Sequence, residues 1–209
     1  MGNLFSVSKA LEHVGIEAII TSSPECLREA RAVVLPGMGA FGDAMQELRA
    51  RRLVEPLRNF AQSGRPFLGI CLGLQLLLEK SEEFGLHEGL GVMAGRVVRF
   101  DAPKTDERAL KVPQVGWNAL RPPRSFTNAV WLHTPLEGLK DGVQAYFAHS
   151  YHALPSDPSN VLATSRYGNV EFASALRRGS VFGLQFHPER SGARGIDVYH
   201  AFAKLVRDQ

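Results

Sequence analysis

Cysteine is scarce in this sequence: only Cys26 and Cys71 occur among 209 residues. Two cysteines cannot build a disulfide framework, and no Cys-x-x-Cys pair or Cys/His cluster predicts a bound metal. A chain of this length can bury a sizeable core without such crosslinks. We therefore expect a protein of the reducing cytoplasm that is stabilised by its hydrophobic core.

Long apolar runs and concentrated charge are also absent. No run of about 18 uncharged apolar residues predicts a transmembrane helix, and the first residues lack the basic-then-apolar order of a signal peptide. The 24 Lys and Arg residues exceed the 21 Asp and Glu residues by three, and the basic residues are scattered. Scattered charge argues against nucleic acid or an anionic membrane as a partner. With 44% hydrophobic residues, residues 1–209 are expected to form one domain.

Strand-like and helix-like segments alternate in the first part of the chain. The expected strands cover 16–20, 29–37 and 65–73, and the expected helices cover 3–14, 43–62 and 74–84. Alternation of this kind predicts an α/β fold, a flavodoxin-like doubly wound sheet that is mostly parallel.

The second half of the chain has a different texture. Its apolar and aromatic segments are short and are separated by Pro, Gly and Asn, which predicts an antiparallel extension of the sheet. A last helix is expected over 193–207. The expected strands of this half cover 95–100, 129–133, 144–154, 160–167, 171–179 and 180–189.

The strongest local signal is the segment GICLG at 69–73. It follows an apolar strand and opens an apolar helix, which is the context of a nucleophile elbow with sulfur in place of a hydroxyl. The glycines allow a sharp turn, and the N-terminal end of a helix favours a thiolate at Cys71. On these five residues alone, a buried structural cysteine between packing glycines is an equal alternative.

A second signal is QFHPE at 185–189. His187 and Glu189 are two positions apart, so they point to the same side of an extended chain. A base oriented by a carboxylate is what a cysteine nucleophile requires. The alternative for His187 alone is a hydrogen-bonded histidine at the end of a strand. Because Cys71 lies far away in the sequence, the fold has to bring the two groups together.

A third signal is PGMGAFG at 36–42, at the end of an expected parallel strand. Loops at the carboxyl ends of such strands form ligand crevices, and their backbone N–H groups can stabilise an oxyanion. The phosphate interpretation is weak, because no Gly-Lys-Ser/Thr follows the loop, and the spacing of Gly37, Gly39 and Gly42 alone is a weak signal.

Five segments together resemble a known family: GICLGLQLLLEKSEE, PGMGAFGDAM, PQVGWN, YFAHSY and QFHPERSG. They are similar to the class I glutamine amidotransferases over nearly the whole chain. PGMGAFG and the Gly-Trp-Asn segment favour one branch of that family, the glutaminase subunits of imidazole glycerol phosphate synthase in histidine biosynthesis.

The resemblance implies a fold, a reaction and a site without a cofactor. Cys71 is expected to attack the side-chain amide of L-glutamine, with His187 as general base and then acid and Glu189 orienting it. The backbone N–H groups of Met38 and Leu72 are expected to form the oxyanion hole. The residues implied in glutamine binding are Gly37, Gly39, Gln75, Glu83, His149, Ser150 and Tyr151.

The family works as a heterodimer, so a partner is also implied. Ammonia released at Cys71 is expected to enter a (β/α)8 barrel cyclase subunit, which forms imidazole glycerol phosphate and an aminoimidazole carboxamide ribotide. Asn3, Trp117 and Arg190 match positions at that subunit interface. The family commonly has Lys where Arg190 stands, and a planar guanidinium does not reproduce the contacts of an ammonium.

The start of the chain departs from the family pattern. Members typically begin with an apolar strand and a Gly-rich turn before a Gly-Asn pair, whereas here Gly2 and Asn3 follow Met1 directly. We therefore expect a sheet that lacks its first, central strand, and a working protein that starts upstream of Met1.

Three other functions compete with this interpretation. Amidotransferase subunits serving vitamin B6, aminobenzoate or nucleotide synthesis share the Cys and His motifs but not PGMGAFG and Gly-Trp-Asn. Peptidases and chaperone-like hydrolases with an elbow cysteine tend to have His directly after it, where Leu72 stands here. A flavodoxin-like interaction module without activity does not require a Cys71, His187 and Glu189 set.

Overall fold

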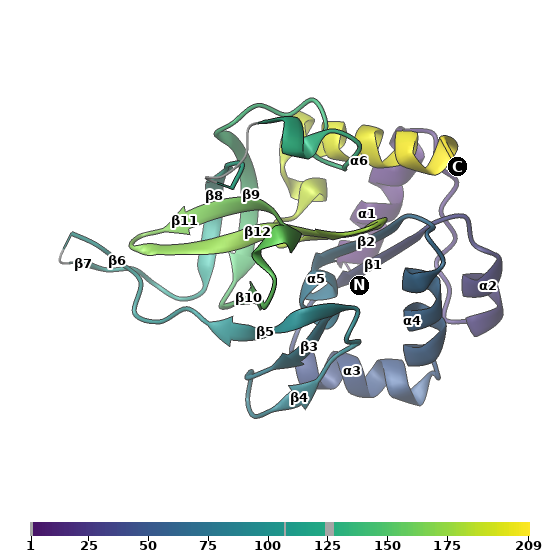
Figure 1. Ribbon diagram of the computed structural model, residues 1–209, viewed down its shortest axis with the longest axis horizontal. Coiled ribbons are helices and arrows are strands. Elements are labelled where there is room, and N and C mark those ends of the chain that lie inside the picture. The colour runs from purple at the N-terminus through teal and green to yellow at the C-terminus, as the bar shows by residue number, and fades with distance from the viewer. Residues whose placement is uncertain (1, 107, 124–127) are drawn as a thin grey trace.

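The computed structural model describes residues 2–106, 108–123 and 128–209, and side chains within 4–106, 108–123 and 130–209. A twisted sheet runs through the molecule, with helices packed on both faces of its parallel part (Figure 1). In the described residues, its strands follow the order β1 (Val33–Gly37), β2 (Phe67–Cys71), β13 (Val181–Leu184), β12 (Val170–Arg178), β10 (Tyr151–Pro155), β5 (Met93–Arg99), β3 (Leu78–Ser81) and β4 (His87–Glu88), with β11 (Val161–Tyr167) paired to β12.

The strands β1, β2 and β13 are parallel. The alternating pattern predicts this for β1 and β2, whereas β13 belongs to the second half, where an antiparallel extension is expected. Gly37 at the end of β1 lies opposite Cys71 at the end of β2, and Leu184 at the end of β13 lies opposite Ile70. Because carboxyl ends of parallel strands share one edge of a sheet, the loop after β1, the turn after β2 and the segment after β13 meet there.

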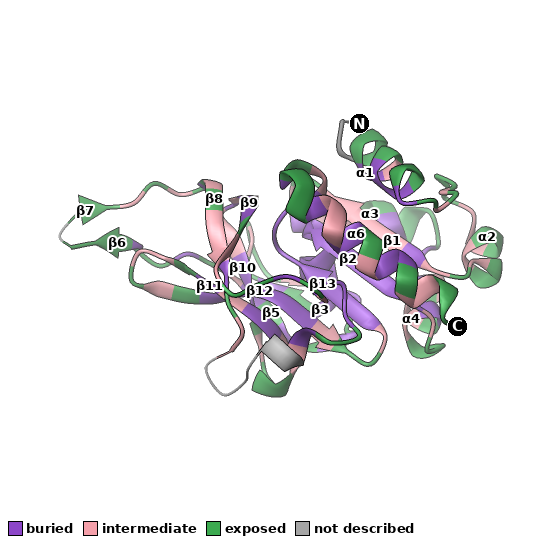
Figure 2. Ribbon diagram, turned by 90° about the horizontal axis from the view of Figure 1, so that it is seen from above, coloured by how far each residue is buried: buried purple, intermediate pink, exposed green. Residues whose placement is uncertain are grey.

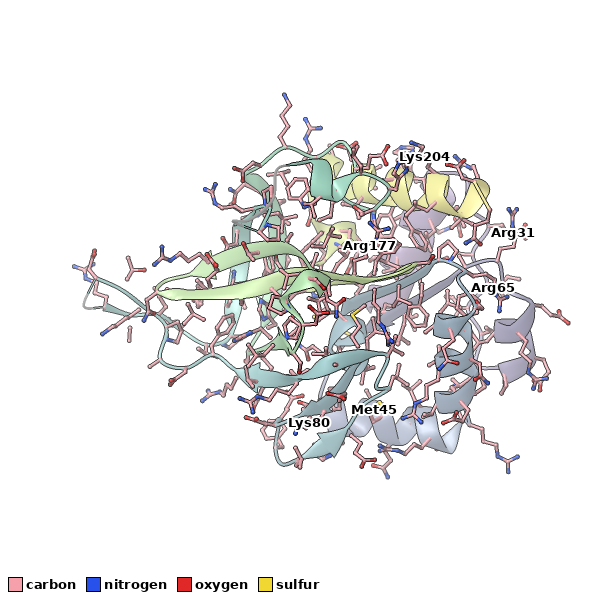
Figure 3. The ribbon with its side chains drawn as sticks, in the orientation of Figure 1. Arg31, Met45, Arg65, Lys80, Arg177 and Lys204 are labelled. Atoms are coloured by element: carbon pink, nitrogen blue, oxygen red, sulfur yellow. The ribbon has the colours of Figure 1, made fainter. Side chains whose placement is uncertain are left out.

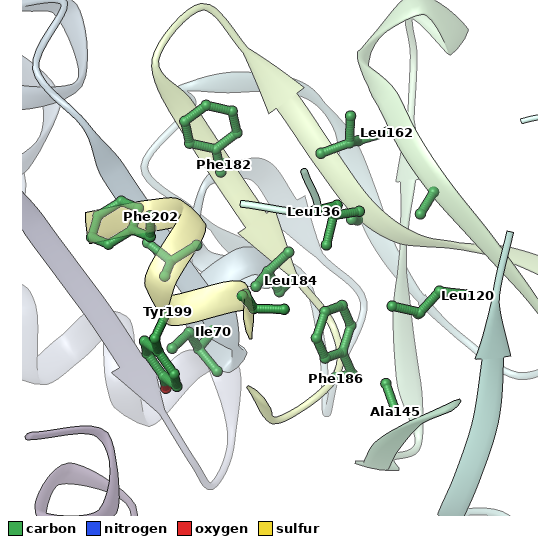
Figure 4. Packing of buried hydrophobic residues seen from close by; sticks show 14 of the residues in the cluster. Ile70, Leu120, Leu136, Ala145, Leu162, Phe182, Leu184, Phe186, Tyr199 and Phe202 are labelled. Atoms are coloured by element: carbon green, nitrogen blue, oxygen red, sulfur yellow. The ribbon is translucent and has the colours of Figure 1, made fainter. Parts of the chain in front are cut away.

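Two hydrophobic clusters hold this part of the sheet between helices. Leu68 and Ile70 of β2 face α1 (Gly2–His13) and α6 (Gly192–Arg207). Phe67 faces α3 (Phe41–Ala50) and α4 (Val54–Gln62). Because successive side chains of a strand point to opposite faces of the sheet, β2 contributes residues to both clusters. Figure 2 shows the buried strands between the half-exposed helices, and Figure 4 shows Ile70 packed near Tyr199 of α6.

Charged side chains lie on the outside of this core. Arg31, Lys80 and Lys204 are exposed, whereas Met45 of α3 is fully buried (Figure 3). A short helix, α2 (Pro24–Glu29), is capped by Ser23, whose hydroxyl accepts from the Cys26 N–H. Within the described residues, none of the helices is both long enough and apolar enough to cross a membrane.

The second half forms the expected antiparallel extension. β12 pairs antiparallel with β13, β11 and β10, and β10 pairs antiparallel with β5. A separate two-stranded sheet joins β8 (Gln114–Leu120), which the sequence interpretation missed, to β9 (Val143–His149). A small hairpin of β6 (Lys104–Thr105) and β7 (Arg108–Ala109) projects from this end of the molecule (Figure 1).

The expected strand over 16–20 is wrong. The segment has no regular secondary structure, and Ile19 and Ile20 are 78% and 62% exposed. In the part of the chain that the structure describes, β1 is the edge of the sheet and no strand pairs with its outer side. An extended segment gains ladder hydrogen bonds only from a neighbouring strand, and 16–20 has none.

Two expected helices are also corrected. The segment 43–62 divides into α3 and α4, because the chain turns at Arg52 with φ +57°. The segment 74–84 contains only the end of α5 (Leu72–Leu76), followed by strand β3, which pairs parallel with β5. The carbonyl of Leu77 accepts from the N–H groups of Val92 and Met93, so a contact between distant segments replaces the next helical turn.

The expected strand over 129–133 is also wrong. Residues Asn128–Trp131 form a 3-10 helix, η1, in which the buried Trp131 indole N–H donates to the Leu162 carbonyl at 2.8 Å. Two more 3-10 turns among the described residues are η2 (Pro158–Asn160) and η3 (Pro188–Arg190). The segment 144–154 is split between β9 and β10 at Ser150.

Candidate active site

Cys71 lies at the strained turn between β2 and α5. Its φ of +54° and ψ of −109° place an L-residue in a region that such residues rarely adopt. A Cβ on Gly73 would collide with the Leu35 carbonyl of β1, and one on Gly69 would lie 2.7 Å from the Gly73 oxygen. The two glycines therefore let the turn pack against β1, which is the geometry of a nucleophile elbow.

His187 and Glu189 follow β13 and reach the same place. His187 Nδ1 is 2.8 Å from Glu189 Oε1, and the Glu189 side chain is 1% exposed. The backbone around them is fixed: the His187 N–H donates to the Tyr146 carbonyl, and the Ser191 hydroxyl donates to the His187 carbonyl at 2.7 Å. The Glu189 carboxylate thus orients the imidazole, while Tyr146 of β9 and Ser191 hold the backbone of His187.

The environment of His187 favours its charged form. Burial by itself lowers the pKa of His187, but hydrogen bonds to Cys71 and Glu189, together with their negative charge, raise it to about 10. The imidazole is therefore protonated at neutral pH when it lies between these two groups. Such an imidazolium can both stabilise a thiolate and donate its proton to a leaving group.

Tyr199 of α6 lies behind Glu189 and was not identified from the sequence. Burial and the Glu189 carboxylate raise the pKa of Tyr199 above its ordinary range, so the phenol keeps its proton. Among the described residues, Tyr199 Oη and Glu189 Oε2 are both buried without a hydrogen-bond partner. The only available signal was the helical spacing of Tyr199 with Val198 and Phe202 on the buried face of α6, which indicates a core position rather than a site.

A cleft of about 570 Å³ opens in front of Cys71. The predicted residues that line it are Met38, Gly39, Cys71, Leu72, Gln75, Glu83, His149, Ser150, Tyr151, His187, Glu189 and Arg190. The cleft also includes Ser6, Pro113 and Ala148, which the sequence interpretation did not single out. Gly37 lies just outside this wall, where a Cβ would approach that of Leu72 to 2.9 Å.

The polar groups of the cleft carry different charges. Glu83 is half-buried, and its Oε2 accepts from the Phe41 N–H at 2.7 Å, at the start of α3. His149 is neutral, because burial lowers its pKa to about 3. Its Nδ1 donates to the Tyr151 carbonyl at 2.8 Å, and its Nε2 has no partner within the described residues. The cleft therefore offers an anionic group and a neutral acceptor.

Arg190 is the predicted partner-contact residue that lines the cleft in the described part of the chain. Its guanidinium lies 4.6 Å from the centre of the Tyr146 ring. Trp117 is 57% exposed on β8 and contacts the same ring edge-on, at 6.2 Å between centres. Trp117, Tyr146 and Arg190 thus form a continuous row beside the cleft. The Asn3 side chain lies outside the described residues.

Comparisons with known proteins identify the family of the chain. Residues 2–204 match the family described as glutamine amidotransferase class-I. The chain is 46% identical to the "Imidazole glycerol phosphate synthase subunit HisH" of Sulfurimonas denitrificans over 204 residues, which cover 98% of this chain and 94% of that one. The protein of the same name from Rhodopirellula baltica is 47% identical, with 97% and 93% covered. A solved structure titled "Crystal structure of glutamine amidotransferase" shares the fold, with a TM-score of 0.71, 22% identity, and 99% and 95% covered.

Proposed function

The chain belongs to the class I glutamine amidotransferases, and we propose that it is the glutaminase subunit of an imidazole glycerol phosphate synthase. The observation that carries the proposal is that Cys71, at its elbow, lines one cleft together with His187 and Glu189, whose side chains are 2.8 Å apart. Full-length relatives at 46% and 47% identity bear the name of that subunit.

In the first half-reaction, Cys71 Sγ attacks the side-chain amide carbon of L-glutamine. The oxygen becomes an oxyanion, and the backbone N–H groups of Met38 and Leu72 stabilise it. The C–N bond then breaks, and the proton carried by His187 goes to the leaving nitrogen, so ammonia departs and a glutamyl thioester remains. In the second half-reaction, His187 takes a proton from water, hydroxide attacks the thioester, and glutamate leaves.

The cleft explains how the substrate is held. Glu83 supplies the negative charge that faces the α-ammonium of glutamine. Gly37 and Gly39 shape the loop that carries the Met38 N–H. His149, Ser150 and Tyr151 lie at the junction of β9 and β10, on the side assigned to the α-carboxylate. The amide nitrogen of Gln75 is already used within the protein, so Gln75 acts on the substrate by shaping the wall.

A partner is part of the proposed function. The ammonia passes into a (β/α)8 barrel cyclase subunit, which incorporates it into imidazole glycerol phosphate and releases the aminoimidazole carboxamide ribotide. Exposed apolar side chains near the cleft support such a contact, since large exposed apolar patches mark interaction surfaces. They include Phe5 at 65%, Val115 at 62% and Trp117 at 57% exposed. Together with Asn3 and Arg190, they form the proposed interface.

The test compares glutamine with ammonium salt as the nitrogen source. Cys71→Ala cannot form the thioester, so the complex with the barrel subunit should lose glutamine-dependent synthesis and keep ammonium-dependent synthesis. Cys26→Ser, at an exposed cysteine, is the matched control and should keep both. Loss of the ammonium-dependent reaction in Cys71→Ala would mean that Cys71 has a structural role.

A further inference from the structure

Gln185 is a buried polar side chain for which the reaction described above has no role. It follows β13, is fully buried, and its backbone N–H donates to the Ser174 carbonyl at 2.9 Å. It precedes His187 by two positions, in the bend between β13 and η3. Gln185 Nε2 lies 3.8 Å from Cys71 Sγ, within reach of a hydrogen bond to sulfur.

The orientation of the Gln185 amide follows from its neighbours. Gln75 lies 3.0 Å from the Tyr151 carbonyl oxygen and 3.1 Å from the Gln185 side chain. A carbonyl oxygen only accepts, so Gln75 must present its NH2 group there. The same NH2 group then faces the oxygen of Gln185, which leaves the Gln185 nitrogen facing Cys71. Donors thus point in one direction, from Gln75 through Gln185 to the sulfur.

We propose that Gln185 is a catalytic residue that donates its amide N–H to the Cys71 sulfur. The inference rests on the proposed function and deepens it. Cys71 is only 8% exposed and belongs to a hydrophobic cluster, where a thiolate has little water and needs protein donors. His187 is one donor, but it gives up its proton to the leaving ammonia. Gln185 is neutral and keeps its hydrogen, so it supports the thiolate before attack and again when the thioester is hydrolysed.

The test measures Cys71 directly, by alkylation with iodoacetamide as a function of pH in a Cys26→Ser background. Gln185→Met keeps the length of the side chain and removes the donor. Gln185→Glu keeps the shape and places an oxygen against the sulfur. Both should move the half-maximal pH of alkylation upward, Glu further than Met. Glutamine turnover should fall about ten-fold or more with little change in KM, as expected for a lost hydrogen bond to a charged group.

Ser174→Ala is the matched control. Ser174 is fully buried on β12, and its hydroxyl has no hydrogen-bond partner in the described residues, so its removal should leave the alkylation profile unchanged. The role of Gln185 is refuted if Gln185→Met is alkylated and hydrolyses glutamine like the wild type. It is also refuted if the half-maximal pH of alkylation shifts no further in Gln185→Met than in Ser174→Ala. Because alkylation needs no glutamine, a wild-type chain that alkylates normally but never hydrolyses glutamine would refute the proposed function instead.

Discussion

Single buried polar groups determine how well the reacting residues are aligned. Glu189 holds His187 through one carboxylate oxygen, and Tyr199 lies near the same carboxylate. The sequence pattern QFHPE predicts the first contact, because both residues lie in one motif. It gives no indication of Tyr199 or of the Gln75–Gln185–Cys71 chain, since those partners come from separate elements and only the folded chain brings them together.

Tyr199→Phe tests the alignment of Glu189. The ring and its packing remain, while the buried hydroxyl near the Glu189 carboxylate is lost. We expect kcat for glutamine hydrolysis to fall by about 5- to 30-fold with KM unchanged, and the acid limb of the pH–rate profile to move to higher pH. Val198→Ala, at the preceding buried position of α6, should destabilise the fold and leave the profile in place. An unchanged kcat and acid limb in Tyr199→Phe would show that Tyr199 only packs.

At the scale of elements, the parallel part of the sheet and its motifs were predictable and their boundaries were not. The apolar segments that became β1 and β2 are local patterns with turn residues behind them. The segments 74–84 and 16–20 failed because their conformation depends on distant partners. The first pairs with β5 as strand β3, and the second pairs with no strand in the part of the chain that the structure describes.

The packing of α5 against β1 predicts a large effect of one methyl group. Gly73→Ala places a Cβ against the Leu35 carbonyl. This carbonyl belongs to the backbone of β1, so it cannot rotate away from the new methyl group as a side chain can. We expect a loss of about 3 kcal/mol or more in the free energy of unfolding, measured by urea denaturation. Gly64→Ala is the control: its φ is +80° but nothing lies within 4 Å, so about 1–2 kcal/mol is expected. Equal losses in both variants would contradict the close approach of elbow and strand.

At the scale of the whole molecule, His149 makes stability depend on pH. Folded His149 has a pKa of about 3 against an ordinary value of 6.5, so the unfolded chain binds an extra proton between these values. Stability is complete above pH 6.5 and is lost as pH falls through this window. His187 adds nothing between pH 6.5 and 3, because its pKa of about 10 leaves it largely protonated in both states once the pH is below 6.5. His152, whose pKa burial also lowers, acts in the same direction as His149.

His149→Asn separates the contribution of His149. An Asn amide can still donate to the Tyr151 carbonyl, but it does not titrate. Between pH 6.5 and 5, His149 accounts for a loss of about 2 kcal/mol. Between pH 6.5 and 5, the free energy of unfolding should therefore drop by about 2 kcal/mol less in the variant than in the wild type. Urea titrations at each pH measure this difference. Parallel curves for the two proteins would mean that His149 is protonated in the folded state.

Nitrogen released at Cys71 is predicted to reach the product made by the partner subunit. The most direct measurement supplies the complex with glutamine labelled by a heavy isotope at the side-chain amide, in the presence of excess unlabelled ammonium, and determines the label in imidazole glycerol phosphate by mass spectrometry. We expect labelled product from the wild type and only unlabelled product from Cys71→Ala. Unlabelled product from the wild type, or label carried over by Cys71→Ala, would contradict the account.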